Sequence, residues 1–422
     1  MTQKRRSSFL LLGLAYLGFV SIGLPDGLLG VAWPSIRTHF QLSLDALGPL
    51  LIVFTTGYVL SSFSSGRILS RINVGALLAL SCLMTAISLL GYALASSWWL
   101  MVALASLAGL GAGAIDAGVN AYAATHHSAR TLNWLHACYG VGAASSPILM
   151  TAVIGANLPW QWGYGLVGIG QFALAMCFGL TYKHWPAPQP PSTTTESQTP
   201  SHIQTLRLPA MRLSIVAFFV YTGVEAAVGT WTYSLFTEAR AVPIHTAGLW
   251  VSIYWASLTV GRLLCGLIVN LMPIDRLLRF CIIGVGLGMA LIWSSITTAL
   301  SFLGLALVGL TAGPIFPSLI ATTPQRLGLT HTANGVGFQI AAAALGQSLL
   351  PALVGVLARR TGLEVIGPFL FGAAVLLLVV HAFLMVVSMK KTSSLKDVAL
   401  ITNPSPHLCE ARRARHYGGL RR

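Results

Sequence analysis

The chain has 422 residues, of which 55% are hydrophobic and only 8% are charged. About 25% of the residues of an average soluble protein are charged, so this composition excludes an ordinary soluble domain. A formal net charge of +15 could suggest nucleic acid, but the distribution of the basic residues along the chain excludes it as a partner.

Apolar runs of about 20 residues recur along nearly the whole chain, and each could cross about 30 Å of hydrocarbon as a helix. Strands of a membrane barrel alternate apolar and polar residues, and these runs do not. We therefore predict an all-α membrane protein with twelve transmembrane helices. The predicted spans cover residues 8–31, 44–65, 74–95, 99–123, 132–156, 162–182, 211–237, 245–270, 276–298, 301–322, 334–358 and 366–389.

The first apolar run follows Lys4, Arg5 and Arg6, an arrangement that secretory signal peptides also show. The run is longer than the apolar region of a signal peptide, contains Pro25 and Asp26, and lacks a small-residue cleavage site. We therefore interpret it as the first transmembrane span.

One long polar segment interrupts the apolar runs between the sixth and the seventh span. It is rich in Pro, Ser and Thr, a composition typical of flexible linkers. We therefore predict an N-terminal six-helix bundle over residues 1–182, a cytoplasmic linker over 183–210, a C-terminal six-helix bundle over 211–389 and a cytoplasmic basic tail over 390–422.

The basic residues predict the orientation in the membrane. With both termini in the cytoplasm, only Arg37, Arg240, Arg359 and Arg360 of the 25 Lys and Arg fall in external loops. The other 21 lie on the inside, as the positive-inside rule requires. We expect a multi-pass protein of a bacterial inner (cell) membrane with both termini cytoplasmic. The basic tail is either a plain disordered segment or adds attraction to anionic lipid.

The two halves repeat one sequence pattern. Leu107–Ala121 and Leu307–Ala321 share seven identities at an offset of 200 residues. The segment Asp26-x-x-x-Gly30 of the first span returns as Glu225-x-x-x-Gly229 in the seventh. With six spans in each half, both repeats enter the membrane in the same sense, which predicts parallel repeats around a central site.

The loop after the second span carries a basic motif. Its residues Gly66-Arg67-Ile-Leu-Ser-Arg71 resemble the signature G-x-x-x-D-R-x-G-R of the major facilitator superfamily, although Ser70 stands at the position of the acidic residue. The resemblance implies a gating loop that contains Gly66, Arg67 and Arg71, without the acidic partner of the usual salt bridge.

Three spans carry further polar motifs: Asp116-x-x-x-Asn120 in the fourth, Arg130-Thr-Leu-Asn133-Trp-Leu-His136 in the fifth, and Tyr221-x-x-x-Glu225-x-x-x-Gly229-x-Trp231 in the seventh. These motifs resemble the fucose–proton symporter-like, sugar-transporting branch of the superfamily. The resemblance covers essentially the whole chain except the linker and the tail. It implies the major facilitator fold, a monomer, and transport by rocking one half against the other.

Three acidic residues, Asp26, Asp116 and Glu225, lie inside predicted spans. A charge at the bilayer centre costs at least about 2.5–3.5 kcal/mol, and such residues normally face an internal cavity on an ion or substrate pathway. A proton that enters Asp26 or Asp116 would remove a buried charge and change the cost of closing that cavity. Proton binding would then be linked to alternating access.

Asp116 and Asn120 lie four residues apart and therefore on one face of a helix. They either bind proton and solute or form a hydrogen-bonded pair that holds helices together. We favour the first interpretation, because an asparagine alone could form the structural bond without a charge. Asp26 follows Pro25, and interrupted helices often build transport sites. The alternative for Asp26 is a kink near one membrane face.

The remaining candidate residues are Asn133, His136, Trp231 and Gln339. His136 could carry a proton, donate to a solute hydroxyl or form a structural hydrogen bond. Trp231 could stack on a sugar ring or anchor the span at the membrane interface. Phe316 stands in the second half where Asp116 stands in the first, which concentrates the predicted proton chemistry in the N-terminal half.

These observations predict a secondary active transporter that works by alternating access and imports a small polar solute, such as a sugar, with protons. Sodium could use the same carboxylates. A proton-driven exporter of drugs or metabolites and a membrane sensor without transport remain alternatives. The chain has no G-x-x-x-x-G-K-[ST] pattern for nucleotides, so we do not predict ATP-driven transport. An intramembrane enzyme is a further alternative, in which Asp26 and Asp116 would form a catalytic pair, but neither lies in a familiar intramembrane protease motif, so we predict no enzyme. The six cysteines show no metal-ligand spacing, so we predict no cofactor or metal site.

Overall fold

The computed structural model describes residues 2–126, 129–186, 201–268 and 271–402, and this part of the chain is helical with no strand. Twelve of its helical segments are long and apolar enough to cross a membrane, as predicted. The first half contains α1 (Thr2–His39), η1 (Leu44–Ala46), α2 (Leu47–Leu69), α3 (Val74–Leu94), α4 (Trp98–His126), α5 (Ala129–Gly155), α6 (Gln161–Thr181) and η2 (Tyr182–His184).

The second half begins with a short helix that precedes the next spans. It contains α7 (His202–Arg207), α8 (Pro209–Ser234), η3 (Leu235–Ala239), α9 (Ile244–Ile268), α10 (Ile274–Ser294), α11 (Thr298–Ala312), α12 (Ile315–Ala321), α13 (Thr323–Leu327), α14 (Leu329–Thr361), η4 (Leu363–Val365) and α15 (Ile366–Thr402). The division of the chain into two bundles at residues 182 and 211 stays a prediction. Half of the predicted linker (187–200) and the end of the tail (403–422) lie outside the described residues.

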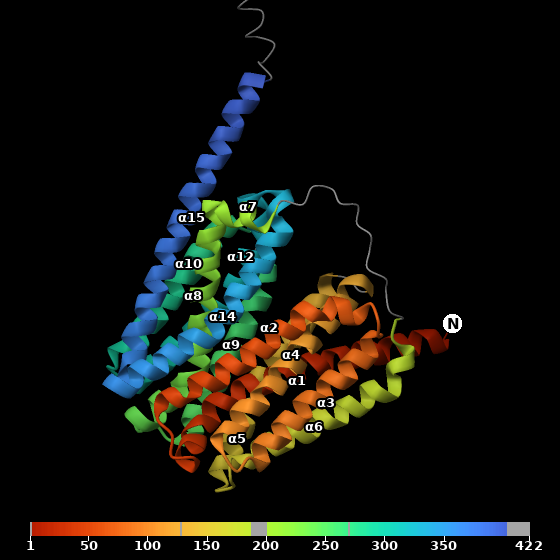
Figure 1. The fold of residues 1–422 in the computed structure, drawn as a ribbon. Coiled ribbons are helices and arrows are strands. Elements are labelled where there is room, and N and C mark those ends of the chain that lie inside the picture. The colour runs from red at the N-terminus through yellow and green to blue at the C-terminus, as the bar shows by residue number, and fades with distance from the viewer. Residues whose placement is uncertain (1, 127–128, 187–200, 269–270, 403–422) are drawn as a thin grey trace, which may run out of the picture.

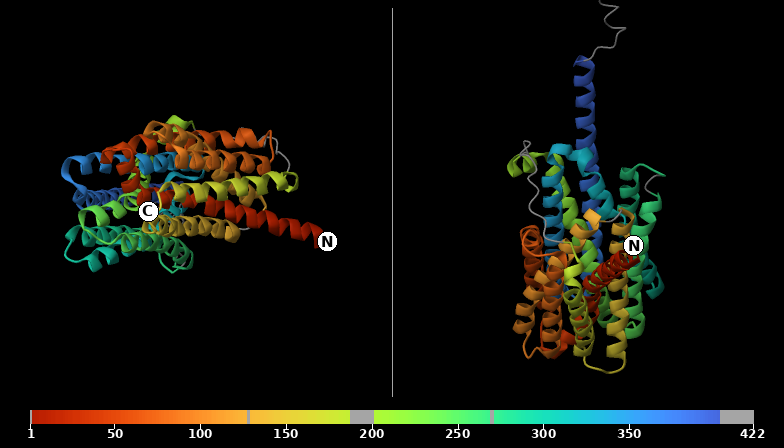
Figure 2. Two further views of the ribbon diagram at one scale, coloured as in Figure 1. Left: turned by 90° about the horizontal axis from the view of Figure 1, so that it is seen from below. Right: turned by 90° about the vertical axis from the view of Figure 1, so that its right-hand side faces the viewer.

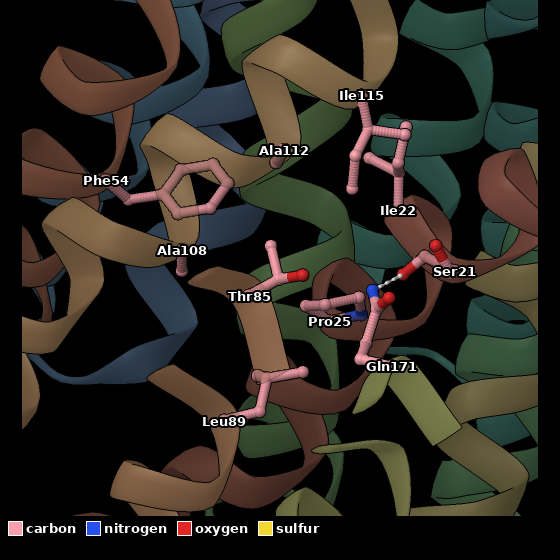
Figure 3. A pocket seen from close by; sticks show the side chains of 10 residues that line it. All are labelled: Ser21, Ile22, Pro25, Phe54, Thr85, Leu89, Ala108, Ala112, Ile115 and Gln171. Atoms are coloured by element: carbon pink, nitrogen blue, oxygen red, sulfur yellow. Dashed lines mark hydrogen bonds between the residues drawn. The ribbon is translucent and has the colours of Figure 1, made fainter. Parts of the chain in front are cut away.

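The first helix is longer than the sequence suggested. α1 continues to His39, whereas the predicted span ended at residue 31, so Asp26 lies in the middle of a helix rather than near one membrane face. Pro25 does not end the helix, although it has no N–H for the carbonyl four residues before it, that of Ser21. The side-chain amide of Gln171 on α6 donates to that carbonyl at 3.1 Å (Figure 3).

The sequence repeat corresponds to a structural repeat with one difference. α3 and α10 begin and end at positions 200 residues apart, and α4 and α11 begin 200 residues apart. The segment predicted as one tenth helix is divided into α11 and α12 between Ala312 and Ile315. The second half has Pro314 and Pro317 where the first has Ala114 and Ala117, and proline cannot continue the hydrogen-bonding pattern of a helix.

Helices of the two halves meet along α1 with α8, α2 with α14, and α5 with α9. The approach is close enough to require glycine: a Cβ atom added at Gly140 of α5 would lie 2.0 Å from the hydroxyl oxygen of Thr259 on α9. The two sets of helices diverge toward the end that carries the N-terminus and the extension of α15, and converge at the opposite end (Figures 1 and 2).

At the convergent end, two ion pairs join the halves. Arg37 at the end of α1 contacts Glu238 of η3 at 2.5 Å, and Asp45 of η1 contacts Arg359 of α14 at 2.9 Å. The described part of the chain has no ion pair between the halves at the divergent end. The structure is therefore closed at the end of the η1 loop and separated at the opposite end, where α1 begins and α6 ends (Figure 1).

Candidate functional site

Asp116 is held on α4 by two neutral donors. The hydroxyl of Tyr58 on α2 donates to one carboxylate oxygen at 2.6 Å, and the side-chain amide of Asn120 donates to the other at 2.9 Å. The helical spacing of Asp116 and Asn120 brings them together as predicted. Both side chains are half-buried.

Asp26 has an equivalent partner. The hydroxyl of Tyr139 on α5 donates to its carboxylate at 2.5 Å. α1 and α5 lie so close that a Cβ atom added at Gly27 would meet the carbonyl oxygen of Ala143 at 2.4 Å. The glycine beside Asp26 therefore allows the approach that brings the tyrosine within hydrogen-bond distance.

The two tyrosine–aspartate pairs share one geometry. The six spans of the first half form two consecutive groups of three, α1–α3 and α4–α6. In each pair, the carboxylate lies on the first helix of one group (α1 or α4), and the tyrosine lies on the second helix of the other group (α5 or α2). Neither Asp26 nor Asp116 forms an ion pair within the described residues. The hydrogen bonds that these carboxylates accept from the tyrosine hydroxyls and from the amide of Asn120 thus come from neutral donors.

Glu225 differs because a cation compensates its charge. The guanidinium of Arg262 on α9 lies 3.1 Å from its carboxylate, and the hydroxyl of Tyr221, one turn earlier on α8, donates to the same carboxylate. Tyr254 donates to the backbone carbonyl of Glu225 at 2.8 Å. The Glu225 side chain is 6% exposed and that of Arg262 is 25% exposed, so the pair is buried on the Glu225 side.

The two aspartates and the ion pair face one another across the contact between the halves. Asp26 interacts electrostatically with Glu225, and His136 interacts with both Asp116 and Arg262. The His136 ring is exposed and packs edge-on against Phe19. An exposed ring that lies near charged groups of both halves faces the space between them rather than the lipid.

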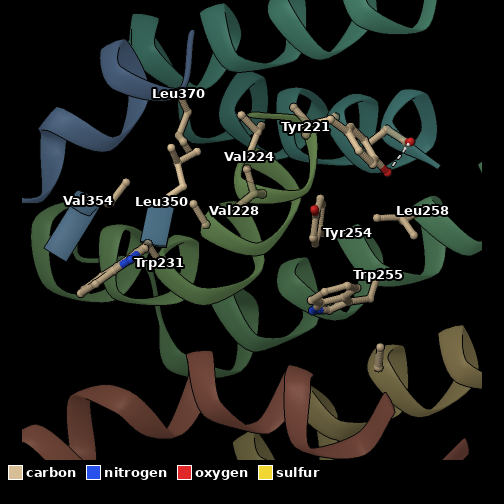
Figure 4. Packing of buried hydrophobic residues seen from close by; sticks show 14 of the residues in the cluster. Tyr221, Val224, Val228, Trp231, Tyr254, Trp255, Leu258, Leu350, Val354 and Leu370 are labelled. Carbon is tan, nitrogen blue, oxygen red and sulfur yellow. Dashed lines mark hydrogen bonds between the residues drawn. The ribbon is translucent and has the colours of Figure 1, made fainter. Parts of the chain in front are cut away.

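Two predicted site residues lie apart from this cluster. Trp231 is fully buried, and its indole N–H donates to the carbonyl oxygen of Pro351 at 2.9 Å. Figure 4 shows it beside Leu350 and Val354, away from Tyr221. Gln339 is also buried and accepts a hydrogen bond from Thr323 at 3.0 Å. Both side chains pack within the second half.

The predicted gating loop lies at the end of α2, with exposed side chains at Arg67 and Arg71. Neither arginine forms an ion pair with a residue that the structure describes. A Cβ atom added at Gly66 would meet nothing within 4 Å, so this glycine makes no close contact in the present state. The side chain of Asn133 lies outside the described residues.

Sequence reasoning missed Arg262, Tyr58 and Tyr139. Arg262 was counted among the 21 basic residues on the inside, which is wrong, because it lies within α9 and pairs with Glu225. The sequence already indicated a special role for Arg262, because this residue stands eight residues inside the predicted span 245–270. Placing an arginine within the bilayer costs about as much free energy as placing a carboxylate there. The tyrosines carried no signal, because tyrosine is common in apolar helices.

The cluster places two carboxylates that can accept protons opposite an ion pair whose two charges cancel. The surrounding hydroxyl, amide, imidazole and guanidinium groups can donate to a polar solute. The described residues contain no group of three or more His, Cys, Asp and Glu arranged to hold a metal ion.

Known proteins resemble the chain over most of its length. It is 23% identical over 392 residues to bypass of stop codon protein 6 of Saccharomyces cerevisiae, covering 82% of this chain and 77% of that protein. It is 22% identical over 351 residues to the glucose/mannose transporter GlcP of Bacillus subtilis, covering 81% and 86%. A crystal structure of the nucleoside transporter NupG superposes with a TM-score of 0.75 at 14% identity, covering 89% and 99%.

The family is shown by a match along the sequence. The model of the Major Facilitator Superfamily matches residues 15–339, which is more than half of the chain. The predicted fold and the predicted likeness to sugar transporters are thereby confirmed. The chain belongs to the major facilitator superfamily of membrane transporters.

Proposed function

We propose that the chain imports a small polar solute, such as a sugar, together with protons across a bacterial inner membrane. The observation that carries this proposal is the asymmetry of charge in the central cluster. Asp26 and Asp116 of the first half accept hydrogen bonds from neutral tyrosine hydroxyls, whereas Glu225 of the second half is paired with Arg262.

The asymmetry of charge provides a reason for protons to bind to the first half during the transport cycle. When the halves close over the cluster, the carboxylates of Asp26 and Asp116 lose water, and each unpaired charge becomes costly. A proton bound to each carboxylate removes that cost. The ion pair of Glu225 and Arg262 is neutral as a whole and can be enclosed without a proton.

The donors around the cluster support a hydroxyl-rich solute. Asn120, His136 and Arg262 present amide, imidazole and guanidinium groups, which can donate to hydroxyl oxygens. The similarity to a glucose/mannose transporter favours a sugar among such solutes. With both termini in the cytoplasm, the divergent end of the helices opens inward, so this conformation would release the solute inside.

Purified protein in liposomes that hold a pH-sensitive dye tests the proposal. A panel of monosaccharides is added outside, with the Asp26→Asn/Asp116→Asn double variant as the matched control. We expect internal acidification with at least one sugar in the wild type and none in the variant. A sugar flux without acidification would contradict proton coupling, and repeating the assay with a sodium gradient would then identify sodium as the coupling ion.

The same two unpaired carboxylates favour one second candidate, an exporter of lipophilic cations. A cationic solute could replace the protons as the partner of Asp26 and Asp116. Competition distinguishes the two functions: a lipophilic cation that releases protons from the protein and is itself transported, with no response to any monosaccharide, would favour export over sugar import.

A further inference from the structure

We propose that Gln171 on α6 is a positioning residue for Asp26, because it supplies the hydrogen bond that Pro25 removes from α1. This inference rests on the role proposed for Asp26 in proton coupling. The bond joins the side-chain N–H of Gln171 to the backbone carbonyl of Ser21, as Figure 3 shows.

The position of Ser21 explains why the bond is needed. In a helix, the N–H of residue 25 would bond to the carbonyl of residue 21, and Pro25 has no N–H. The Ser21 carbonyl lies in a buried part of α1, where an unsatisfied polar group is costly. The hydroxyl of Ser21 cannot help, since it donates to the carbonyl of Gly18 at 2.7 Å.

Another proline in the same half is compensated within its own helix. Pro147 of α5 leaves the carbonyl of Ala143 free, and the neighbouring hydroxyl of Ser146 contacts that carbonyl at 3.4 Å. α1 has no such local donor at Pro25 and depends on a side chain from α6. The geometry beside Asp26 is therefore set by a second helix.

Packing alone does not fix α1 at this point. On the α5 side the fit is tight, since a Cβ atom added at Gly23 would lie 2.1 Å from the carbonyl oxygen of Tyr139. A cavity of about 20 Å³, to which α5 contributes no lining residue, also adjoins Pro25 and is lined by Phe54 and Ala112 among others (Figure 3). α1 could bend into this space if the bond from Gln171 were lost.

Such a bend would move the residue next to Pro25. Asp26 receives its hydrogen bond from Tyr139 at 2.5 Å, and this distance depends on where α1 lies against α5. The Gln171 side chain is itself 2% exposed, and its Oε1 atom has no partner among the described atoms. Burying a side-chain amide whose oxygen has no hydrogen-bond partner is unfavourable. The hydrogen bond from the Gln171 N–H to the Ser21 carbonyl must therefore offset this cost and stabilise the contact between α6 and α1.

Two substitutions test the proposal as a pair. Gln171→Leu removes the donor, and Pro25→Ala restores the backbone N–H that makes the donor unnecessary. We expect Gln171→Leu to shift the midpoint of the pH dependence of carbodiimide labelling at Asp26 by about 0.5–1 pH unit. In the Pro25→Ala background the same substitution should shift it several-fold less.

The matched control is Gln161→Leu, which makes the same change at the start of α6, near the convergent end of the helices. It should leave the labelling midpoint unchanged. The proposal is overturned if Gln171→Leu has no effect, if its effect is the same with Pro25→Ala, or if Gln161→Leu has an equal effect. If Gln171→Leu alone does not yield folded protein, recovery of folded protein by adding Pro25→Ala supports the proposal, and failure to recover overturns it.

Labelling of Asp26 does not require that the chain transport any solute. A chain that takes up no sugar but shows the coupled shift would refute the proposed substrate and leave the role of Gln171 intact. A chain that takes up sugar with protons but shows no coupled shift would refute only the role of Gln171.

Discussion

The carboxylates of the central cluster have two kinds of partner, and their substitutions should therefore have two kinds of effect. Asp26 and Asp116 accept hydrogen bonds from tyrosine hydroxyls, which stay neutral, whereas Glu225 contacts the permanent charge of Arg262. Removing the charge of an aspartate leaves no unpaired group behind. Removing the charge of Glu225 leaves an arginine without its counter-ion.

Asp116→Asn should abolish accumulation of solute against a gradient while exchange of solute across the membrane continues. The asparagine keeps the size of the side chain and can still bond to Tyr58, but it cannot carry a proton. We expect at least about a tenfold loss of proton-driven uptake, which corresponds to about 1.4 kcal/mol, and exchange within twofold of wild type, both measured in liposomes. Asn157→Asp, in the exposed loop before α6 at the closed end of the molecule, is the control and should leave both rates intact.

Glu225→Gln should lower the thermal stability of the purified protein, because Arg262 then stays buried without its counter-ion. Breaking a buried ion pair costs about 3–5 kcal/mol, and the partial exposure of Arg262 places the expected value at or below the lower end. The double variant Glu225→Gln/Arg262→Gln should be more stable than the single one. Additive losses of Tm in this double-mutant cycle would show that the two side chains are not coupled.

At the scale of helices, the sequence predicts features that depend on a single segment, such as the position of a span, and does not predict contacts between two helices. Run length and apolar composition located twelve spans, because each span must satisfy its own backbone within the membrane. Pro314 and Pro317 also predict the break between α11 and α12, although the single span predicted over residues 301–322 did not take them into account.

The partners of the candidate site could not be predicted in the same way. Tyr58 pairs with a residue 58 positions away and Tyr139 with one 113 positions away, so each contact depends on how the helices pack. The spacing of Asp116 and Asn120 could be predicted, because it lies within one helix. The continuation of α1 through Pro25 depends on Gln171 of α6 and is likewise invisible in the sequence of α1.

The contact between α5 and α9 gives a test at the level of these helices. Gly140→Val places methyl groups where Thr259 now lies and should separate the two helices. We expect at least about a fivefold loss of transport, since overpacking a tight contact typically costs about 1–3 kcal/mol. Gly170→Val on α6, where an added Cβ meets nothing within 4 Å, should be nearly neutral. Partial recovery of Gly140→Ala by Thr259→Ala would assign the loss to this contact, and equal defects in both valine variants would exclude it.

For the whole molecule, the decisive feature is that the ion pairs between the halves lie only at the closed end within the described residues. If the halves rock about the central cluster, Arg37–Glu238 and Asp45–Arg359 must separate when this end opens. They therefore stabilise the present conformation over its alternative without altering either half. Pairs as exposed as these contribute about 0.2–1 kcal/mol each, so losing both should shift the ratio of the two conformations by up to about 30-fold.

Charge exchange separates this role from a general effect on folding. Asp45→Arg and Arg359→Asp should each widen the distance between spin labels placed at Asn157 and Ala241, which lie in loops of the two halves near the closed end. The double variant re-forms the pair in reverse and should restore the narrow distance distribution. Because the pairs are exposed, high salt should widen the wild-type distribution in the same direction. A narrow distribution in both single variants would show instead that the helix contacts alone keep this end closed, as the tight approach of α5 and α9 could do without any charge.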